Sequence, residues 1–385
     1  MVMPYLFETD EHAGIRASAH RFASTHIAPQ AARWEEDEEF PIELYATAAK
    51  AGVVGVGYPE DVGGQGGDLG HVLAASEEML LAGRSVGTLV GLGSHGIALP
   101  PIIRFGTAEQ KARFVTPCLR DGKIAALGIT EPGGGSDVAS LATKAERDGD
   151  HYIITGAKTF ITSGTRADFV TTAVRTGGPG HGGISLVVIE RGTPGFEVSK
   201  KLKKTGWWAS DTAELRFDAC RVPIANRIGP ENGAFPMIMM NFANERLMLA
   251  GQCVAIAELA YRESIAYTRE RQAFGKALTG FQVTRHKLAD MASQIAAARA
   301  LTGEAVIRVL RGEAPGTTAG LAAMAKNVAT DMCCDVCDHA VQIHGGYGYM
   351  RETLVERLYR DARLYPIGGG TREIMNEVIA KTEGY

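Results

Sequence analysis

Residues 235–261 read FPMIMMNFANERLMLAGQCVAIAELAY, an apolar run at helical spacing that carries one adjacent acid and base, Glu245 and Arg246. Apolar residues occupy nearly every face of this predicted helix, so we expect it to be buried on all sides. A buried charge is costly unless it is paired, hydrogen-bonded or facing a polar ligand. The dipeptide is therefore either a structural link between helices or a carboxylate whose pKa is tuned by burial for proton abstraction. The helix by itself favours the structural link.

The composition indicates an ordinary globular chain of two or three domains. It has 385 residues, of which 45% are apolar and 22% are charged, and domains average about 150 residues. A formal net charge of −4 gives no electrostatic reason to bind nucleic acid or an anionic membrane. We expect no membrane span and no signal peptide, and hence a cytoplasmic protein of bacterial type.

Six cysteines are too few for a disulfide scaffold in a chain of this length. Three of them, Cys333, Cys334 and Cys337, lie in the segment DMCCDVCDH at 331–339, where the last two form a C-x-x-C pair. A zinc or redox site is one interpretation. Because the segment looks helical and has no second ligand pair, small buried apolar side chains are the simpler one.

Residue periodicity divides the chain into three domains, 1–120, 121–225 and 226–385. The first is predicted to be helical, with helical patterns at 11–34, 42–51, 69–81 and 86–105. In the second domain the period becomes two and β-branched residues dominate. Its strands are expected at 169–174, 184–189 and 213–217, and residues 148–164 are expected to form a turn, a strand, a tight turn and a strand.

The third domain is predicted to be an antiparallel helical bundle. Long amphipathic runs cover about 233–269, 281–311 and 317–344, and a last helix starts near Thr371, a good N-cap residue. The fold class is therefore α+β and multidomain. It consists of an N-terminal helical domain, a middle antiparallel β-barrel or sandwich, and a C-terminal four-helix bundle.

Three glycine-rich segments lie at the expected domain edges: LGITEPGGGSDVAS at 127–140, QIHGGYG at 342–348, and Gly368–Gly370 before Thr371. Such loops can present backbone N–H groups to a phosphate, and the third also lies at a helix start. Each alone could be a plain turn or a helix end. Together they suggest one extended, phosphate-bearing ligand.

ITEPGGGSD, QIHGGYGY and RQAFGKALTGFQ, in the order helix, β domain, helix, resemble the acyl-CoA dehydrogenase family, and the resemblance runs from about residue 6 to 383. The resemblance is strongest to the long-chain and isovaleryl-type members. It implies a flavoprotein oxidoreductase that binds FAD, acts on an acyl-CoA in fatty acid metabolism (β-oxidation) and passes electrons to an electron-transfer flavoprotein. It also implies a homotetramer assembled as a dimer of dimers.

The resemblance assigns cofactor-binding residues position by position. The set that lines the flavin and pyrophosphate comprises Leu127, Ile129, Thr130, Gly135 and Ser136, with Phe160, Ile161 and Thr162 beside the isoalloxazine. The set expected from a neighbouring subunit comprises Arg271, Phe274, Gln282, Gln342, His344, Gly345 and Gly346. Thr371 and Glu373 match contacts at the start of the last helix.

One departure from the family pattern concerns the catalytic base. Most members carry a Glu in Glu-Gly-Thr before the last helix, and this chain has Gly369 there. A minority place the base in Glu-Arg-Leu on a bundle helix, which matches Glu245. Two carboxylates at one substrate carbon would repel each other, so a site should hold only one. Expected substrate neighbours are Ser136, Asn244, Arg246, Gly369 and Gly370, with the Gly369 N–H bonding the thioester oxygen.

The activity implied is removal of the α-proton by Glu245 while the β-hydride passes to flavin N5, which gives a trans-2-enoyl-CoA. Two alternatives remain open. One is an acyl-CoA oxidase that uses O₂, and the other is a non-catalytic flavin-binding scaffold. The missing base at Gly369 reverses the first interpretation of Glu245, because the implied reaction requires a carboxylate and this is the buried acid placed to supply it.

Overall fold

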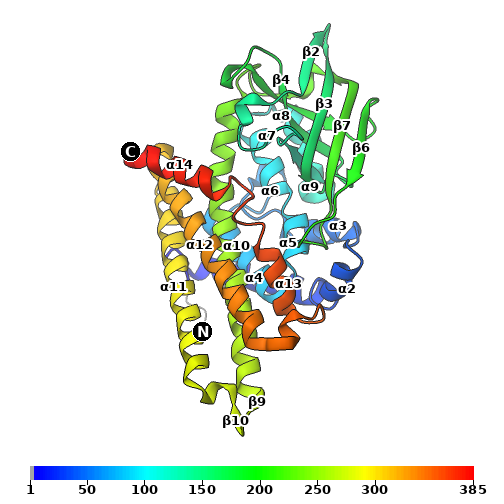
Figure 1. Cartoon of the computed structure of the whole chain (residues 1–385). Coiled ribbons are helices and arrows are strands. Elements are labelled where there is room, and N and C mark those ends of the chain that lie inside the picture. Colours follow the sequence, from blue (N-terminus) through cyan, green and yellow to red (C-terminus); the bar gives the residue numbers. More distant parts are fainter. Residues whose placement is uncertain (1–3) are drawn as a thin grey trace.

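The computed structural model describes residues 4–385, and it consists of a helical N-terminal part, a β-sheet and a bundle of long helices (Figure 1). The predicted fold class is confirmed. The N-terminal helices are α1 (Asp10–His26), α2 (Ala31–Glu36), α3 (Glu43–Lys50), α4 (Leu69–Gly83), α5 (Val86–Leu92), α6 (His95–Ala98), α7 (Pro100–Phe105), α8 (Ala108–Phe114) and α9 (Thr116–Arg120). Short 3-10 segments occur at Glu60–Val62, Val138–Ser140, His181–Gly183, Ile224–Asn226, Leu278–Gly280 and Gly345–Tyr349 (η1 to η6).

The pattern at 86–105 forms three short helices rather than one, because Pro100 begins α7 and Gly93 ends α5. By length and composition this stretch, Val86–Phe105, is the one helical segment of the described chain that could cross a membrane. In the structure 67% of it is buried inside the protein, as in the core helix of a globular chain.

The sheet contains β1 (Ala125–Gly128), β2 (Lys144–Asp148), β3 (His151–Thr162), β4 (Phe169–Arg175), β5 (Ile184–Glu190), β6 (Phe196–Lys201), β7 (Thr212–Pro223) and β8 (Arg227–Ile228). The order is β6-β7-β3-β2-β4-β5-β8, with β1 beside β4. Most pairs are antiparallel, but β1 and β2 each pair with β4 in parallel. The sheet is thus antiparallel, as predicted, except at these two places.

The tight turn predicted within 148–164 is also wrong, since β3 runs without a break through Gly156. This glycine lies at a bulge in the pairing with β7 and has a φ of +153°. A Cβ atom there would lie 2.7 Å from Thr143 Cα. Glycine is thus required for close approach of two strands rather than for a turn.

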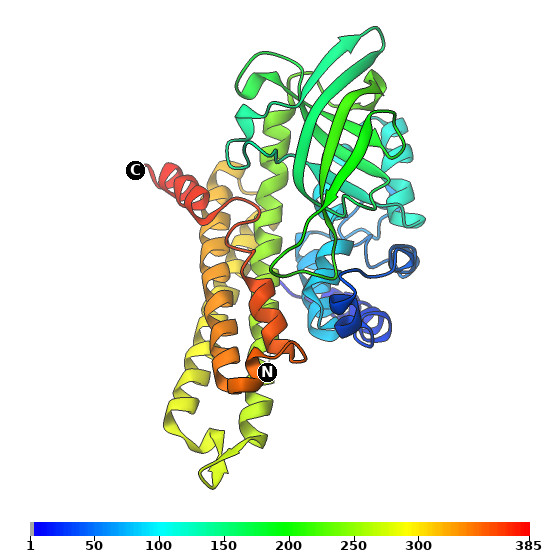
Figure 2. The same ribbon diagram turned by 45° about the vertical axis from the view of Figure 1, so that its right-hand side comes forward.

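The C-terminal part contains α10 (Ala234–Glu270), α11 (Gln282–Leu310), α12 (Pro315–His344), α13 (Leu354–Ala362) and α14 (Arg372–Glu383). The predicted long helices are confirmed to within a few residues. A small hairpin, β9 (Gln272–Ala273) with β10 (Lys276–Ala277), joins α10 to α11 at the end of the bundle far from the sheet (Figure 1). The turned view shows α10 running beside both the sheet and the other bundle helices (Figure 2).

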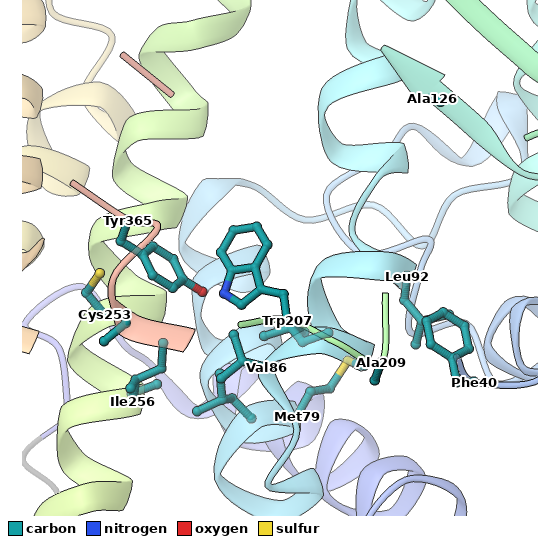
Figure 3. Close-up of a cluster of buried hydrophobic side chains, with 14 of the residues drawn as sticks. Phe40, Met79, Val86, Leu92, Ala126, Trp207, Ala209, Cys253, Ile256 and Tyr365 are labelled. Atoms are coloured by element: carbon teal, nitrogen blue, oxygen red, sulfur yellow. The ribbon is translucent and has the colours of Figure 1, made fainter. Parts of the chain in front are cut away.

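One apolar cluster joins all three parts of the chain (Figure 3). Phe40 and Met79 come from the N-terminal part, Trp207 from the loop between β6 and β7, and Ile256 and Tyr365 from the C-terminal part. The Trp207 and Tyr365 rings meet edge to face with their centroids 5.2 Å apart. Burial of so much aromatic and aliphatic surface makes the three parts one cooperative structure.

The cysteine segment lies in this core. Cys333 and Cys337 are fully buried on α12, near Cys253 of α10. Burial raises the pKa of the Cys333 thiol, and the hydrogen bond with Cys333, together with burial, raises the pKa of Cys337. All six cysteines are free. Within residues 4–385, the one group of three close metal-ligand side chains is His12, Asp68 and His71. Cys333 and Cys337 are therefore packed as small side chains of the core.

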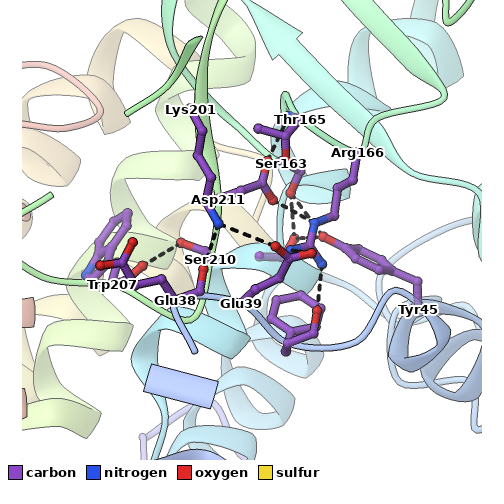
Figure 4. Close-up of polar contacts among 12 residues, drawn as sticks. Glu38, Glu39, Tyr45, Ser163, Thr165, Arg166, Lys201, Trp207, Ser210 and Asp211 are labelled. Carbon is purple, nitrogen blue, oxygen red and sulfur yellow. Dashed lines mark hydrogen bonds and ion pairs between the residues drawn. The ribbon is translucent and has the colours of Figure 1, made fainter. Parts of the chain in front are cut away.

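A buried polar network joins the N-terminal part to the sheet (Figure 4). Asp211 is 1% exposed and accepts hydrogen bonds from Thr165 N and Thr165 Oγ1 at 2.8 and 2.6 Å. It also forms an ion pair with Arg166, 2.7 Å from Nε to Oδ1, and Arg166 donates to the Phe40 carbonyl at 2.9 Å. The Asp211 carboxylate thus holds the Arg166 guanidinium, which in turn is hydrogen-bonded to the Phe40 carbonyl of the N-terminal part.

We predict that Asp211→Asn lowers the free energy of unfolding by about 3–5 kcal/mol, because it leaves the Arg166 charge buried with a weakened partner. Urea unfolding of the purified protein measures the effect. Asp218→Asn is the matched control, since its ion pair with Arg216 is exposed and should matter by about 0.5 kcal/mol or less. Equal losses in the two variants would show that the buried pair has no special structural role.

Candidate active site

Glu245 lies in the first third of α10, next to the segment that connects α13 to α14. Its side chain is half-buried, and its Oε2 atom is fully buried without a hydrogen-bond partner in the described chain. Burial raises the pKa of Glu245 to about 7, against the opposing effects of Arg246 and Lys326. A carboxylate with this pKa can take up a proton near neutral pH.

Gly369 lies directly beside this carboxylate. It has a φ of +66°, in the left-handed region that favours glycine. A Cβ atom built on Gly369 would lie 3.5 Å from Glu245 Oε1 and 2.5 Å from Leu249 Cδ1. A side chain at position 369 would thus enter the space next to the Glu245 carboxylate, and Leu249 fills part of that space.

Two cations hold the glycine segment in place. Arg246, which is buried, donates from Nε to the Gly369 carbonyl at 3.5 Å. Lys326 of α12, also buried, donates from Nζ to the Gly370 carbonyl at 2.6 Å. Thr371 then caps α14 by accepting from Ile374 N at 3.3 Å. The Gly369 N–H has no acceptor within residues 4–385, so it is free to bind a substrate oxygen.

Lys326 was not among the residues expected from the sequence. It is a lone lysine in the apolar, alanine-rich helical segment LAAMAKNVAT at 321–330. A buried lysine, like a buried glutamate, is unfavourable unless a polar partner compensates for its charge. This isolated lysine was therefore the sequence signal that could have identified Lys326. In the structure burial lowers the pKa of Lys326 to about 8.

The glycine-rich loop after β1 is held by a second buried lysine. Lys158 of β3 donates to the Ile129 carbonyl at 3.0 Å and to Glu131 Oε1 at 2.7 Å. Glu131 in turn accepts from Thr143 N at 2.9 Å, and Thr159 N donates to the Thr130 carbonyl at 2.9 Å. These contacts fix the path of the loop against the end of β3 and leave residues 133–137 exposed.

The side chains around this loop fit the flavin that the sequence predicts. Phe160 has a φ of +59° and leaves 68% of its surface exposed at the end of β3, while Ile161 next to it is buried. An exposed aromatic face suits a flat ring system, and the Thr130, Thr162 and Ser136 hydroxyls can donate to ring atoms or phosphate oxygens. Leu127 at the end of β1 and Ile129 and Gly135 on the loop complete this set.

The second predicted set lies elsewhere. Arg271, His344, Gly345 and Gly346 line an open pocket of about 600 Å³, together with Tyr267, Leu278, Ile343, Tyr347 and Met350. Phe274 is 96% exposed on the neighbouring hairpin, and Gln282 and Gln342 are exposed nearby on α11 and α12. Figure 1 places this hairpin at the opposite end of the bundle from the sheet. Within one chain, therefore, the two sets do not meet.

The remaining predicted residues surround the glycine segment and α10. Thr371 is half-buried and Glu373 exposed at the start of α14. Asn244 is exposed on α10, one residue before Glu245. The structure thus brings together Glu245, Arg246, Gly369 and Gly370, and it adds Leu249 and Lys326 to the predicted site.

Comparison with known proteins identifies the family. The models of the acyl-CoA dehydrogenase N-terminal, middle and C-terminal domains match residues 9–121, 126–220 and 232–383. Isobutyryl-CoA dehydrogenase of Bos taurus is 37% identical over 98% of this chain and 90% of its own length. Long-chain specific acyl-CoA dehydrogenase of Sus scrofa is 38% identical over 97% of this chain and 86% of its own length.

Solved structures agree over the full length. A probable acyl-CoA dehydrogenase from Mycobacterium abscessus is 51% identical, with a TM-score of 0.95 over 98% of this chain and 99% of its own. Butyryl-CoA dehydrogenase from Megasphaera elsdenii is 35% identical, with a TM-score of 0.93 over 100% of both chains. On this evidence of sequence and fold, the chain belongs to the acyl-CoA dehydrogenase family, whose members are FAD-dependent flavoprotein oxidoreductases.

Proposed function

We propose that the chain converts an acyl-CoA thioester to the trans-2-enoyl-CoA, with Glu245 as the base that removes the α-proton. The observation that carries this proposal is the position of Glu245 Oε1, 3.5 Å from where a Cβ atom of residue 369 would lie. A carboxylate supplied from α10 thus takes the place of one supplied by the segment before α14. The Gly369 N–H bonds the thioester oxygen and stabilises the negative charge that develops on it.

FAD, when bound, would accept the hydride from the β-carbon. The chain's own part is to hold it, through Thr130, Ser136 and Thr162 on the sheet side and the exposed face of Phe160. The pocket at Arg271 and His344 then serves the cofactor of a neighbouring subunit, because it lies at the other end of the bundle. We propose a homotetramer built from such pairs, in the cytoplasm, that passes its electrons to an electron-transfer flavoprotein.

The substrate proposed is the thioester class rather than one acyl chain. At 37–38% identity, relatives are named for isobutyryl-CoA, for long-chain and for short-chain acyl-CoA. Fatty acid β-oxidation is the reaction sequence that fits the long-chain and short-chain names. Anaerobic titration with straight, branched and aromatic acyl-CoAs, followed by loss of flavin absorbance, assigns the acyl group.

A second candidate is an oxidase that lets O₂ react with reduced flavin. One neighbour that is 30% identical, with a TM-score of 0.93, is described as a prolyl acyl carrier protein oxidase. Oxygen uptake with substrate, compared with reduction of an electron-accepting dye under nitrogen, separates the two activities. A flavin-binding scaffold without catalysis would show neither.

We predict that Glu245→Gln lowers turnover by about 10²- to 10⁴-fold, the usual effect of losing a general base, while FAD remains bound. Steady-state dye reduction and flavin absorbance measure the two properties. Glu258→Gln is the matched control, because Glu258 is another buried acid of α10 and pairs with Arg262 at 2.9 Å. Near-normal turnover in Glu245→Gln would end the assignment of the base.

The pH dependence of stability tests the buried carboxylate without any assay of activity. The pKa of Glu245 is raised to about 7 in the folded chain and is about 4.3 when unfolded. Its contribution to stability is therefore complete below about 4.3 and is lost as the pH rises towards 7. Glu245→Gln should raise Tm more at pH 8 than at pH 5. A gain that is constant or falls with pH would contradict the buried state of this acid.

Relocation of the base gives a further prediction. Adding Gly369→Glu to Glu245→Gln should recover little activity, because the new Cβ atom would lie 2.5 Å from Leu249 Cδ1. Adding Leu249→Ala as well removes that clash, and we expect turnover to rise at least about tenfold above the double variant. Leu249→Ala alone is the control for changes in the pocket. If the triple variant shows no gain, positions 245 and 369 do not address the same substrate atom.

A further inference from the structure

We propose that Lys326 is a positioning residue for proton abstraction, which holds the Gly369–Gly370 segment over Glu245 and keeps a positive charge beside that carboxylate. The inference rests on the proposed role of Glu245. Lys326 acts through the segment and through its charge, so it is not itself a catalytic residue.

The geometry gives Lys326 one contact with the segment and places it beside the space next to Gly369. Its Nζ donates to the Gly370 carbonyl at 2.6 Å, and its Cε lies 3.7 Å from where a Cβ atom of Gly369 would be. Arg246 holds the preceding carbonyl, that of Gly369, at 3.5 Å. Two successive peptide groups are thus fixed by cations from α12 and α10. The conformation of the chain at Gly369, and with it the direction of the Gly369 N–H, depends on these anchors.

The charge of Lys326 has a second consequence for Glu245. Lys326 is fully buried, and it makes no ion pair within 4.0 Å among the described residues. The charged or titratable groups that act on it all lie on α10: Cys253 and Glu245 raise its pKa and Arg246 lowers it. In return Lys326 and Arg246 lower the pKa of Glu245, against its burial. The base therefore stays ionised at a lower pH than burial alone would allow.

A purely structural role for Lys326 would give a different result. Lys326 would then only stabilise the segment before α14, and its loss would lower activity without changing the pH at which Glu245 titrates. Two substitutions separate the roles of the ammonium group. Lys326→Met removes both the donor and the charge, while Lys326→Gln removes the charge and keeps a neutral donor. Thr330→Val is the matched control, since Thr330 is buried one turn further along α12 and bonds only the Asn327 carbonyl.

The experiment uses the FAD-loaded, full-length protein. For Lys326→Met we expect turnover to fall roughly 10- to 100-fold and amide hydrogen exchange of residues 366–371 to increase. We also expect the acid limb of the pH–rate profile to move up by about one pH unit or more, because a nearby positive charge is lost. Lys326→Gln should move the acid limb in the same direction but keep more of the exchange protection. Thr330→Val should change none of these.

An acid limb that stays in place in both Lys326 variants overturns the proposal, whatever happens to the rate. Unchanged exchange at residues 366–371 in Lys326→Met overturns it as well. If Lys326→Met loses FAD or does not fold, the test rests on Lys326→Gln. Its pH–rate profile and its amide hydrogen exchange at residues 366–371 then decide whether the proposal holds. Failure of this proposal can be told apart from failure of the proposed function. If Glu245→Gln is inactive and Lys326→Met behaves like the unmodified protein, only the role of Lys326 is refuted. If Glu245→Gln is active, the assignment of Glu245 as the base is refuted.

Discussion

The burial of the Glu245 carboxylate is the constraint on which the site depends. Glu245 Oε2 is fully buried without a hydrogen-bond partner in residues 4–385, so the charged form is unfavourable and the pKa of the carboxyl rises to about 7. Two cations moderate that rise, Arg246 from the same helix and Lys326 from the next. Both also hold the glycine segment before α14. The sequence presents a structural link and a base as alternatives for the dipeptide. In the structure Arg246 has the structural role, on the Gly369 carbonyl, and Glu245 is left for the proposed role of base.

The packing of the three parts of the chain explains why this arrangement can be stable. Trp207 joins the sheet to the C-terminal part, since its backbone N–H donates to Asp361 Oδ1 at 2.5 Å and its ring contacts Tyr365. Asp361 and Tyr365 lie in and just after α13, directly before the glycine segment. Core packing thus extends to within a few residues of Gly369. The segment beside Glu245 is therefore joined directly to a tightly packed part of the core.

Much of this could be predicted from the sequence, for definite physical reasons. Helical and strand periodicity located α10, α11 and α12 and the strands β3, β4, β5 and β7, because long periodic segments give the strongest signal. The turn at Gly156 was wrong, since glycine marks both turns and close approach of strands. The parallel pairing of β1 with β4 depends on contacts between distant segments, which local pattern does not contain.

The candidate site residues likewise divide into those that local sequence pattern predicts and those that depend on contacts between distant segments. Glu245 was predicted because it interrupts an apolar helix, and Gly369 because a family pattern is broken there. Lys326 and Leu249 were missed, since their roles depend on a contact between α12, α10 and the segment before α14. Arg271 and His344 were predicted as cofactor residues, and only the structure shows that they lie at the far end of the bundle from Phe160.

The contact between Leu249 and the space beside Gly369 has a consequence for how such sites diverge. Moving the base between the two positions involves more than an exchange of two acids, because Leu249 Cδ1 lies 2.5 Å from where the new Cβ must go and has to shift or be replaced. The position of the base is therefore coupled to the conformation or identity of a third, chemically inert side chain.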